Sequence, residues 1–307
     1  MIKRVGKLLS VFACLLGAML LIAPISASAM EGGASGGLGG EDFMGGALPP
    51  PGFYYLNYLM YYSANTVKDG NGNKIEVPTR DFKLKAVVDL NRFVYITKYK
   101  ILGADYGAQV IVPLVYLDVQ AFSPSSDRTS GIGDLIVTPV ILGWHSKNWH
   151  GAFGLDAFVP TGSYDKTGKT PSIGRNYWTS EIAAAFTYLS DSGIEFSSKV
   201  MYDINWENKD TKYKSGNEFH LDALLGYHMG PSWSLGINGY YYKQMTDDTL
   251  NGVTVGDGIR AQVAAIGPAV SYTNAKHITF TAKYHKEFSA KYMPEGDRFW
   301  LKAAIPF

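Results

Sequence analysis

From residue 53 to the last residue, apolar and polar side chains alternate along the chain with a period of two. Between Ile194 and Asn205 the even positions are mostly apolar, whereas the odd positions carry charged or polar groups. Successive side chains of a β-strand point to opposite faces, so this segment predicts a strand with one apolar and one polar face. The same alternation recurs at 82–91, 218–229, 259–266, 277–285 and 298–307, and no window keeps a helical stripe.

About twelve candidate strands follow from this pattern, and most exceed the roughly 5–6 residues typical of soluble proteins. A tilted strand needs about 9–11 residues to cross a membrane. One segment is apolar on both faces from Val110 to Leu117, and there we expect the inner face to be packed rather than hydrated. The candidate strands span residues 53–64, 80–97, 104–120, 132–145, 149–160, 177–189, 193–205, 218–229, 232–244, 258–272, 276–288 and 297–307.

The gaps between these strands are alternately short, as at 146–148 and 190–192, and long, as at 161–176 and 206–217. Short periplasmic turns and long extracellular loops are typical of outer-membrane barrels. An unsatisfied backbone group in lipid is costly, so a membrane-spanning sheet must close on itself. The sequence therefore predicts an all-β fold, a closed antiparallel transmembrane β-barrel over residues 53–307. A secreted sandwich or lipocalin-like barrel is the soluble alternative, but it gives no reason for loop lengths to alternate.

Aromatic residues bracket the candidate strands, and Trp144 and Trp149 flank one short turn. Tryptophan is favoured at membrane–water interfaces, so these two are predicted interfacial aromatics in contact with outer-membrane lipid. The chain ends with Phe299, Leu301 and Phe307 on one face of the last strand. This ending is similar to the C-terminal assembly signal of bacterial outer-membrane barrels, which predicts the barrel-assembly machinery as a partner. The alternative is an ordinary last strand that ends in phenylalanine.

Residues 1–29 have the pattern of a signal peptide. Lys3, Arg4 and Lys7 precede an apolar run from Leu8 to Ile22, and the small residues 27–29 predict cleavage near Ala29. A membrane anchor is the alternative, since the apolar run is almost long enough to span. Cleavage and export would place the mature chain in the outer membrane of a Gram-negative cell. It would also remove the single cysteine and change the net charge from +1 to −2, which gives no basic footprint for nucleic acid.

Residues 30–52 are rich in glycine and end in three prolines, so no regular element is expected there. A phosphate-binding glycine loop would need a preceding strand and a following helix, and neither is predicted. One interpretation is a flexible amino segment that leads into the barrel. The other is a segment folded into the pore, since the lumens of some barrels are plugged by non-strand segments.

The polar faces of the strands supply the predicted lining of the lumen. Their charges nearly cancel, so no strong ion selectivity is expected, and most of these residues are expected only to hydrate or brace the barrel. The predicted pore-lining residues are Lys83, Lys85, Asp89, Asp134, Glu181, Glu195, Lys199, Asp203, Glu218, His220, Asp222, Arg260, Lys283, Arg298 and Lys302.

Neither a metal site nor an enzyme is predicted. Metal binding needs three or four converging ligands, and His220 with Asp222, or His277 with His285, lack that spacing on one strand. Hydrolysis needs a nucleophile, a base and an orienting acid in hydrogen-bond reach. Ser146 follows a histidine, but on a periplasmic turn, and no Gly-x-Ser-x-Gly elbow is present. No cofactor is expected.

Four stretches carry a family resemblance: 131–135 (GIGDL), 158–165 (FVPTGSYD), 265–268 (AIGP) and 294–302 (PEGDRFWLK). Over about residues 50–307 the chain resembles the outer-membrane proteins of the putative meta-pathway of phenol degradation family. The resemblance implies a transmembrane barrel that passes aromatic catabolites across the outer membrane. It defines no binding residues that can be carried over to this chain.

The resulting hypothesis is an outer-membrane channel for passive uptake of small, hydrophobic or aromatic molecules. A non-conducting structural or adhesin-like barrel is the first alternative, and an outer-membrane hydrolase is the second. Fold alone does not decide among them.

Overall fold

A computed structural model describes residues 37–123, 125–167 and 170–307. The predicted signal peptide therefore lies outside the described residues. Within these residues, no helix is long and apolar enough to cross a membrane. The strands are β1 (Gly52–Val67), β2 (Phe82–Ile101), β3 (Ala104–Ala121), β4 (Asp127–Ile132), β5 (Leu135–His145), β6 (Trp149–Val159), β7 (Thr179–Leu189), β8 (Ile194–Asn205), β9 (Tyr213–Lys214), β10 (Glu218–Met229), β11 (Trp233–Gln244), β12 (Thr249–Leu250), β13 (Val253–Thr254), β14 (Gln262–Thr273), β15 (Thr279–Lys291) and β16 (Pro294–Pro306).

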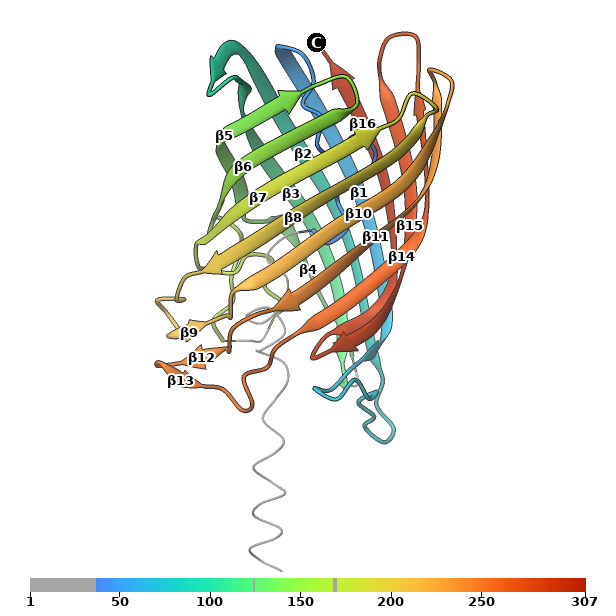
Figure 1. Cartoon of the computed structure of the whole chain (residues 1–307). Helices are drawn as coiled ribbons and strands as arrows, with labels where there is room; N and C mark the ends of the chain where they lie inside the picture. Colours follow the sequence, from blue (N-terminus) through green and yellow to red (C-terminus); the bar gives the residue numbers. More distant parts are fainter. Residues whose placement is uncertain (1–36, 124, 168–169) are drawn as a thin grey trace, which may run out of the picture.

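Twelve of these strands form a closed antiparallel barrel, which confirms the predicted fold class (Figure 1). Around the barrel the order is β2, β1, β16, β15, β14, β11, β10, β8, β7, β6, β5 and β3, and the β2–β3 pair closes the ring. Closure pairs the backbone groups of every strand with two neighbours, which is what a sheet in lipid requires.

The extra strand β4 is an extension of β5. Both pair with β3, β5 through residues 105–111 and β4 through residues 114–119. The two are interrupted only at Gly133 and Asp134, so β4 and β5 together pair along most of β3. The alternating pattern predicts one strand here, from 132 to 145, and does not predict the part before the break.

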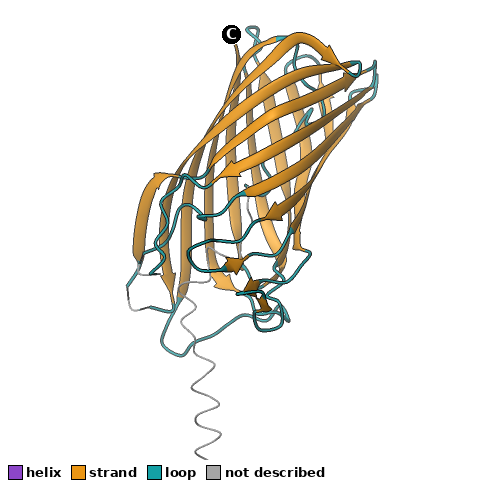
Figure 2. Ribbon diagram, turned by 90° about the vertical axis from the view of Figure 1, so that its left-hand side faces the viewer, coloured by secondary structure: helices purple, strands orange, loops and turns teal. Residues whose placement is uncertain are grey.

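The two ends of the barrel differ as the loop lengths predict. The C terminus and the short turns lie at one end, and the long loops lie at the other (Figures 1 and 2). At the long-loop end β9, β12 and β13 form a separate small sheet. One predicted long loop, 289–296, is mostly strand instead, because β15 runs to Lys291 and β16 begins at Pro294.

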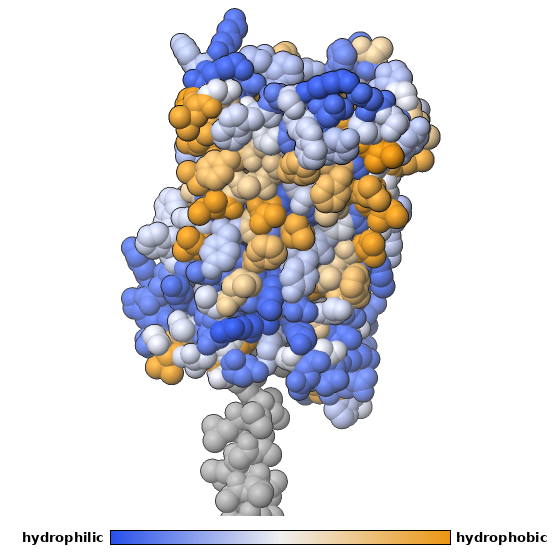
Figure 3. Space-filling model, viewed as in Figure 1, coloured by the Kyte–Doolittle hydropathy of each residue, from blue (hydrophilic) through white to orange (hydrophobic). Residues whose placement is uncertain are grey.

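The outer surface carries an apolar band between more hydrophilic ends (Figure 3). Side chains such as Leu225, Ile237 and Ile266 are more than half exposed there, as lipid-facing residues must be. Trp144 and Trp149 point outward beside the short turn 146–148, and the Trp149 ring lies 4.5 Å from that of Tyr188. The protein is an outer-membrane β-barrel, with this band as its contact with membrane lipid.

The last strand keeps the predicted apolar face on the outside. Phe299 and Leu301 are 42% and 43% exposed, and the terminal Phe307 is 77% exposed. The backbone N–H of Phe307 donates a hydrogen bond to the carbonyl of Phe53, so the C terminus is tied to the first strand of the barrel.

Candidate functional site

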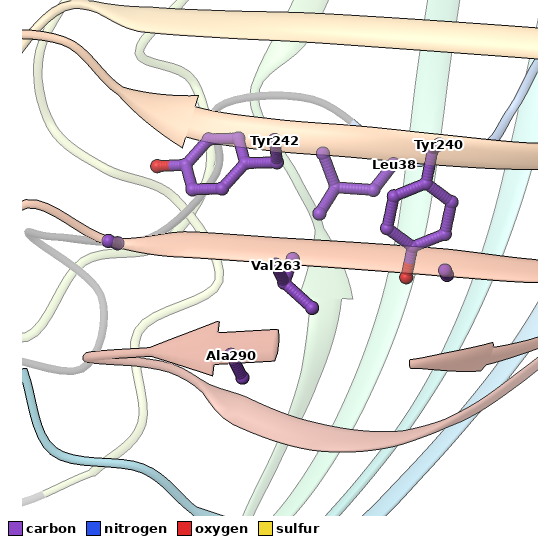
Figure 4. Packing of buried hydrophobic residues seen from close by; sticks show 7 residues of the cluster. Leu38, Tyr240, Tyr242, Val263 and Ala290 are labelled. Carbon is purple, nitrogen blue, oxygen red and sulfur yellow. The ribbon is translucent and has the colours of Figure 1, made fainter. Parts of the chain in front are cut away.

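The lumen contains part of the chain itself. Residues 37–50 belong to the glycine-rich segment 30–52, for which a flexible lead-in and a segment folded into the pore are the two interpretations; residues 30–36 lie outside the described residues. Residues 37–50 contact the inner face of the barrel wall. Leu38 is buried among Tyr240, Tyr242, Val263 and Ala290, which belong to β11, β14 and β15 (Figure 4). We call residues 37–50 the inner segment.

Backbone groups of the inner segment are paired with side chains of the wall. The carboxylate of Asp222 accepts hydrogen bonds from the N–H groups of Gly39 and Glu41, at 3.2 and 2.9 Å. Arg298 donates from Nη1 to the carbonyl of Leu38 at 2.7 Å. A segment without regular structure can remain buried only if its backbone groups find such partners.

Charge pairing reinforces this docking at Glu41. Its Oε1 lies 3.6 Å from Arg92 Nη1 and 3.2 Å from Lys199 Nζ. Burial raises the pKa of Glu41, but Lys199, Arg92, Lys302 and Lys283 outweigh this effect and lower it from 4.5 to about 2. Glu41, which lies outside the spanning strands, therefore stays ionised and attached to the cations at neutral pH.

The next residue, Asp42, is 3% exposed and lies between two lysines. Lys283 Nζ is 3.4 Å from Asp42 Oδ2, and Lys302 binds Oδ1. Lys283 also donates to the carbonyl oxygens of Gly40 and Glu41, both at 2.8 Å. One buried ammonium group thus holds three consecutive residues of the inner segment.

Nearer the periplasmic end, Glu195 binds the inner segment and a histidine together. It accepts from the N–H of Met44 at 2.6 Å, and its Oε2 lies 2.5 Å from His228 Nε2. Ser234 Oγ is 3.0 Å from His228 Nδ1. Serine, histidine and acid are therefore aligned here, but the acid also accepts from Met44 and from Ser197, which fits an anchoring role.

Two glycines explain how the inner segment lies so close to the wall. Gly39 has a φ of +71°, and a Cβ there would lie 2.6 Å from Tyr240 Cδ1 and 2.8 Å from His285 Cε1. A Cβ on Gly46 would lie 2.5 Å from the backbone carbon of Phe186. Glycine is used at these positions because backbone must pass close to other atoms.

Ten predicted pore-lining residues lie on the inward face of their strands. Odd-numbered positions are buried on β7, β8 and β15, and even-numbered positions are buried on β10 and β16. The residues are Glu181, Glu195, Lys199, Asp203, Glu218, His220, Asp222, Lys283, Arg298 and Lys302.

Three predicted lumen residues on β2, Lys83, Lys85 and Asp89, point outward instead. Asp89 is paired in register with Leu59, whose side chain is 41% exposed, whereas Ala86 on the opposite face is buried. The prediction was wrong because it assumed that an apolar face must contact lipid. In this part of the barrel the apolar face packs inside.

Two further predicted lumen residues are not in strands. Asp134 lies in the break between β4 and β5, where its carboxylate accepts from the N–H groups of Gly162 and Arg175, both at 2.8 Å. Arg260 lies before β14, is exposed, and pairs with Asp247 at 2.6 Å. The predicted strands extend into these loop residues because the alternation of apolar and polar residues continues for a few residues beyond a strand end.

The inner surface of β1, β2 and β16 is an apolar cluster that we call the apolar wall. It contains the buried residues Tyr58, Met60, Tyr62, Ala64, Ala86 and Trp300, with Leu56, Phe82, Leu84, Val88, Leu90 and Leu117 packed against them. Even-numbered positions of β2 face inward. Arg92 therefore also faces the lumen, although it is not among the predicted pore-lining residues. Asp156 was also missed, although its alternation with the exposed Leu155 could have revealed it.

A cavity of about 100 Å³ lies between the apolar wall and the charged strands. Its apolar lining includes Leu90, Ile111 and Phe158, and its polar lining includes Glu181 and Lys199. The inner segment contributes residues 37, 38, 40 and 41 to the same lining. The volume is somewhat below the roughly 150 Å³ of an apolar cavity that binds benzene.

Comparison with known proteins connects this architecture to a family. The family model described as "Putative MetA-pathway of phenol degradation" matches residues 64–303. The fold is similar to that of the COG4313 outer membrane channel from Pseudomonas putida F1, with 17% identity, a TM-score of 0.77, and 87% of this chain and 99% of that chain covered. The beta domain of the Bordetella autotransporter BrkA has 10% identity and a TM-score of 0.51, with 84% and 100% covered. No curated protein matches the chain.

Proposed function

This chain belongs to the family described as Putative MetA-pathway of phenol degradation, and from that premise we propose that it is an outer-membrane channel for small hydrophobic or aromatic molecules. The inner segment would limit passage, and movement of that segment would open the lumen. Transport would be passive, since permeants would diffuse down their own gradient.

The proposal rests on the cavity that the inner segment helps to line, because this cavity has an apolar side and a polar side. Once the inner segment has moved, an aromatic permeant would place its ring against Leu90, Ile111 and Phe158 and direct a hydroxyl or carboxylate toward Arg92 or Lys199. Burial of apolar area contributes roughly 25 cal/mol per Å², so a ring gains binding energy there that a sugar does not.

The test is conductance and liposome swelling with a displaced inner segment. Gly46→Ala puts a methyl group 2.5 Å from the backbone of Phe186, so the inner segment must move. Gly151→Ala is the matched control, because its added Cβ would be 3.8 Å from the nearest atom, the oxygen of Ala185. We expect Gly46→Ala to raise single-channel conductance several-fold and Gly151→Ala to leave it unchanged.

Deletion of residues 37–50 gives the limiting case. Swelling of liposomes containing the deleted chain should be faster with phenol or benzoate than with glucose. If neither the deletion nor Gly46→Ala conducts, the barrel is structural or adhesin-like and the channel proposal fails. A hydrolase activity lost in His228→Gln would instead favour the enzyme.

We also propose that the C-terminal strand is recognised by the barrel-assembly machinery, as the exposed Phe299, Leu301 and Phe307 suggest. Phe307→Ser removes the terminal ring but keeps the N–H that is bonded to Phe53. The amount of folded barrel in outer membranes should fall several-fold, whereas the purified variant should refold in detergent as the native chain does. An unchanged level in cells would contradict the proposal.

A further inference from the structure

Four carboxylates lie side by side across four neighbouring strands of the inner wall. Asp156 on β6 pairs in register with Glu181 on β7, Glu181 with Asp203 on β8, and Asp203 with Glu218 on β10. Like charges on directly opposite residues are destabilising. A row of four buried carboxyl groups is stable only where nearby positive charge or protonation offsets this repulsion.

One end of this row converges on a histidine. His220 follows Glu218 by two positions on β10, so both face inward. Asp203 Oδ2 and Glu218 Oε2 each lie 3.3 Å from the same atom, Nε2 of His220. All three residues are at least 97% buried.

Hydrogen bonding does not account for this arrangement. An imidazole Nε2 carries one hydrogen or one lone pair, so it satisfies one oxygen and not two. Neither carboxylate oxygen of Asp203 accepts a hydrogen bond from the described residues. The hydroxyl of Tyr242, whose ring centroid lies 5.1 Å from that of His220, is likewise buried without a hydrogen-bond partner among them.

The spacing fits a shared metal ion. Four tetrahedral ligands at about 2.0–2.1 Å from Zn²⁺ are separated from one another by about 3.3 Å. The two carboxylate oxygens and the imidazole nitrogen lie within 4.8 Å of one another, and both oxygen–nitrogen distances are 3.3 Å. We propose that Asp203, Glu218 and His220 bind one divalent transition-metal ion, of which zinc is the best match.

The surroundings support this assignment. Asn205 Nδ2 donates to Glu218 Oε1 at 2.9 Å, and Arg175 lies 3.7 Å from the same oxygen, so Oε2 is directed toward His220. Such outer partners orient the ligands of metal sites. His220 and Glu181 also line the cavity, from which Glu181 or a water molecule can supply the fourth ligand.

One imidazole with two carboxylates is a donor set for zinc, cobalt or iron rather than for calcium or magnesium, which prefer six or more oxygen ligands. No metal site is predicted from the sequence, because the ligand spacing within either strand alone does not form one. The register of two strands brings these three ligands together.

The experiment is titration of the full mature chain in detergent, after treatment with a chelator, with Zn²⁺ by calorimetry and with Co²⁺ by visible absorption. His145 and His150 lie at the periplasmic end with their Nδ1 atoms 2.9 Å apart, so all chains should carry His150→Gln to prevent adventitious binding. We expect one equivalent of either ion, with tetrahedral cobalt bands, and no binding of Mg²⁺.

Asp203→Asn and His220→Gln should each weaken zinc binding at least a hundred-fold, whereas His228→Gln, where one carboxylate contacts the histidine, should not. Heat-modifiable migration in gels checks that each variant is folded. Anomalous diffraction at the zinc edge is the second measurement and needs no variant: a peak between β8 and β10 is expected. No equivalent of bound metal in the parent chain, or full binding by a folded Asp203→Asn, would overturn the proposal.

Discussion

The apolar wall of β1, β2 and β16 lies across the lumen from the charged strands β7, β8 and β10. Inward side chains are mostly apolar on the first set of strands and mostly charged or polar on the second. The apolar wall is packed like a protein core, with Trp300 at 1% exposure. The opposite side buries Glu181, Asp203 and Glu218 at 5% exposure or less. Alternation along a strand therefore shows that its two faces differ in polarity, but it does not show which face contacts lipid.

The inner segment explains why both walls are possible in one barrel. A water-filled lumen would hydrate every inward side chain, and an apolar inner face would then be unfavourable. Here Leu38 and its neighbours fill part of the space, and Glu41 and Asp42 pair with cations of the wall. The lumen is consequently a largely packed interior in which Glu41 and Asp42 are paired with cations of the wall.

Among substitutions of inward and outward residues, the largest difference in unfolding free energy is expected for lysine. Lys283→Met removes the buried cation that holds Gly40, Glu41 and Asp42, and it leaves a carboxylate with one partner fewer. Breaking a buried ion pair costs about 3–5 kcal/mol of unfolding free energy. Unfolding of the barrel by guanidinium in detergent measures this loss of unfolding free energy.

Lys85→Met is the matched control on the outward face of β2. An exposed substitution changes stability by about 0.5 kcal/mol or less. Equal losses in the two variants would contradict the assignment of inner and outer faces.

Chemical labelling sharpens the same comparison at a single strand. The chain has no cysteine after Cys14, so single cysteines can be placed in the barrel without background. In intact cells a membrane-impermeant maleimide should label Lys85→Cys at least ten-fold faster than Ala86→Cys, because Ala86 is 7% exposed and belongs to the apolar wall. Faster labelling of Ala86→Cys would show that the lumen is open at this level.

The smallest effect is expected in the extracellular loops, outside both walls. Tyr292 donates a hydrogen bond to Asp257, and this bond raises the pKa of Tyr292 from 10.0 to about 12. Since the folded pKa is raised, the bond contributes at pH values below 10 and is lost as the pH rises through about 12.

Tyrosinate absorbance near 295 nm tests this behaviour. The difference between the native chain and Tyr292→Phe should contain one titration step centred near pH 12, with stability changed by about 0.5 kcal/mol or less. A step centred at pH 10 would show that the hydrogen bond to Asp257 is absent in solution.

The sequence alone was sufficient for the closed barrel, its strand number and its family. Long alternating segments and alternating loop lengths can be recognised from consecutive stretches of the chain without knowing which distant residues meet. They also placed Glu195, Lys199 and Asp203 on one face of β8, where the structure has them. The same rule failed for Lys83, Lys85 and Asp89, because the apolar face of β2 packs inside the barrel against apolar side chains of neighbouring strands.

Only the tertiary structure decided where residues 37–50 lie and which side chains meet across strands. A glycine-rich segment has the same sequence pattern whether it is free or docked, and its position depends on partners such as Asp222 and Lys283, more than 180 residues away. The group of Asp203, Glu218 and His220 likewise depends on the register between β8 and β10. Period-two patterning is set residue by residue along one strand, whereas docking and register are set by the closure of the whole barrel.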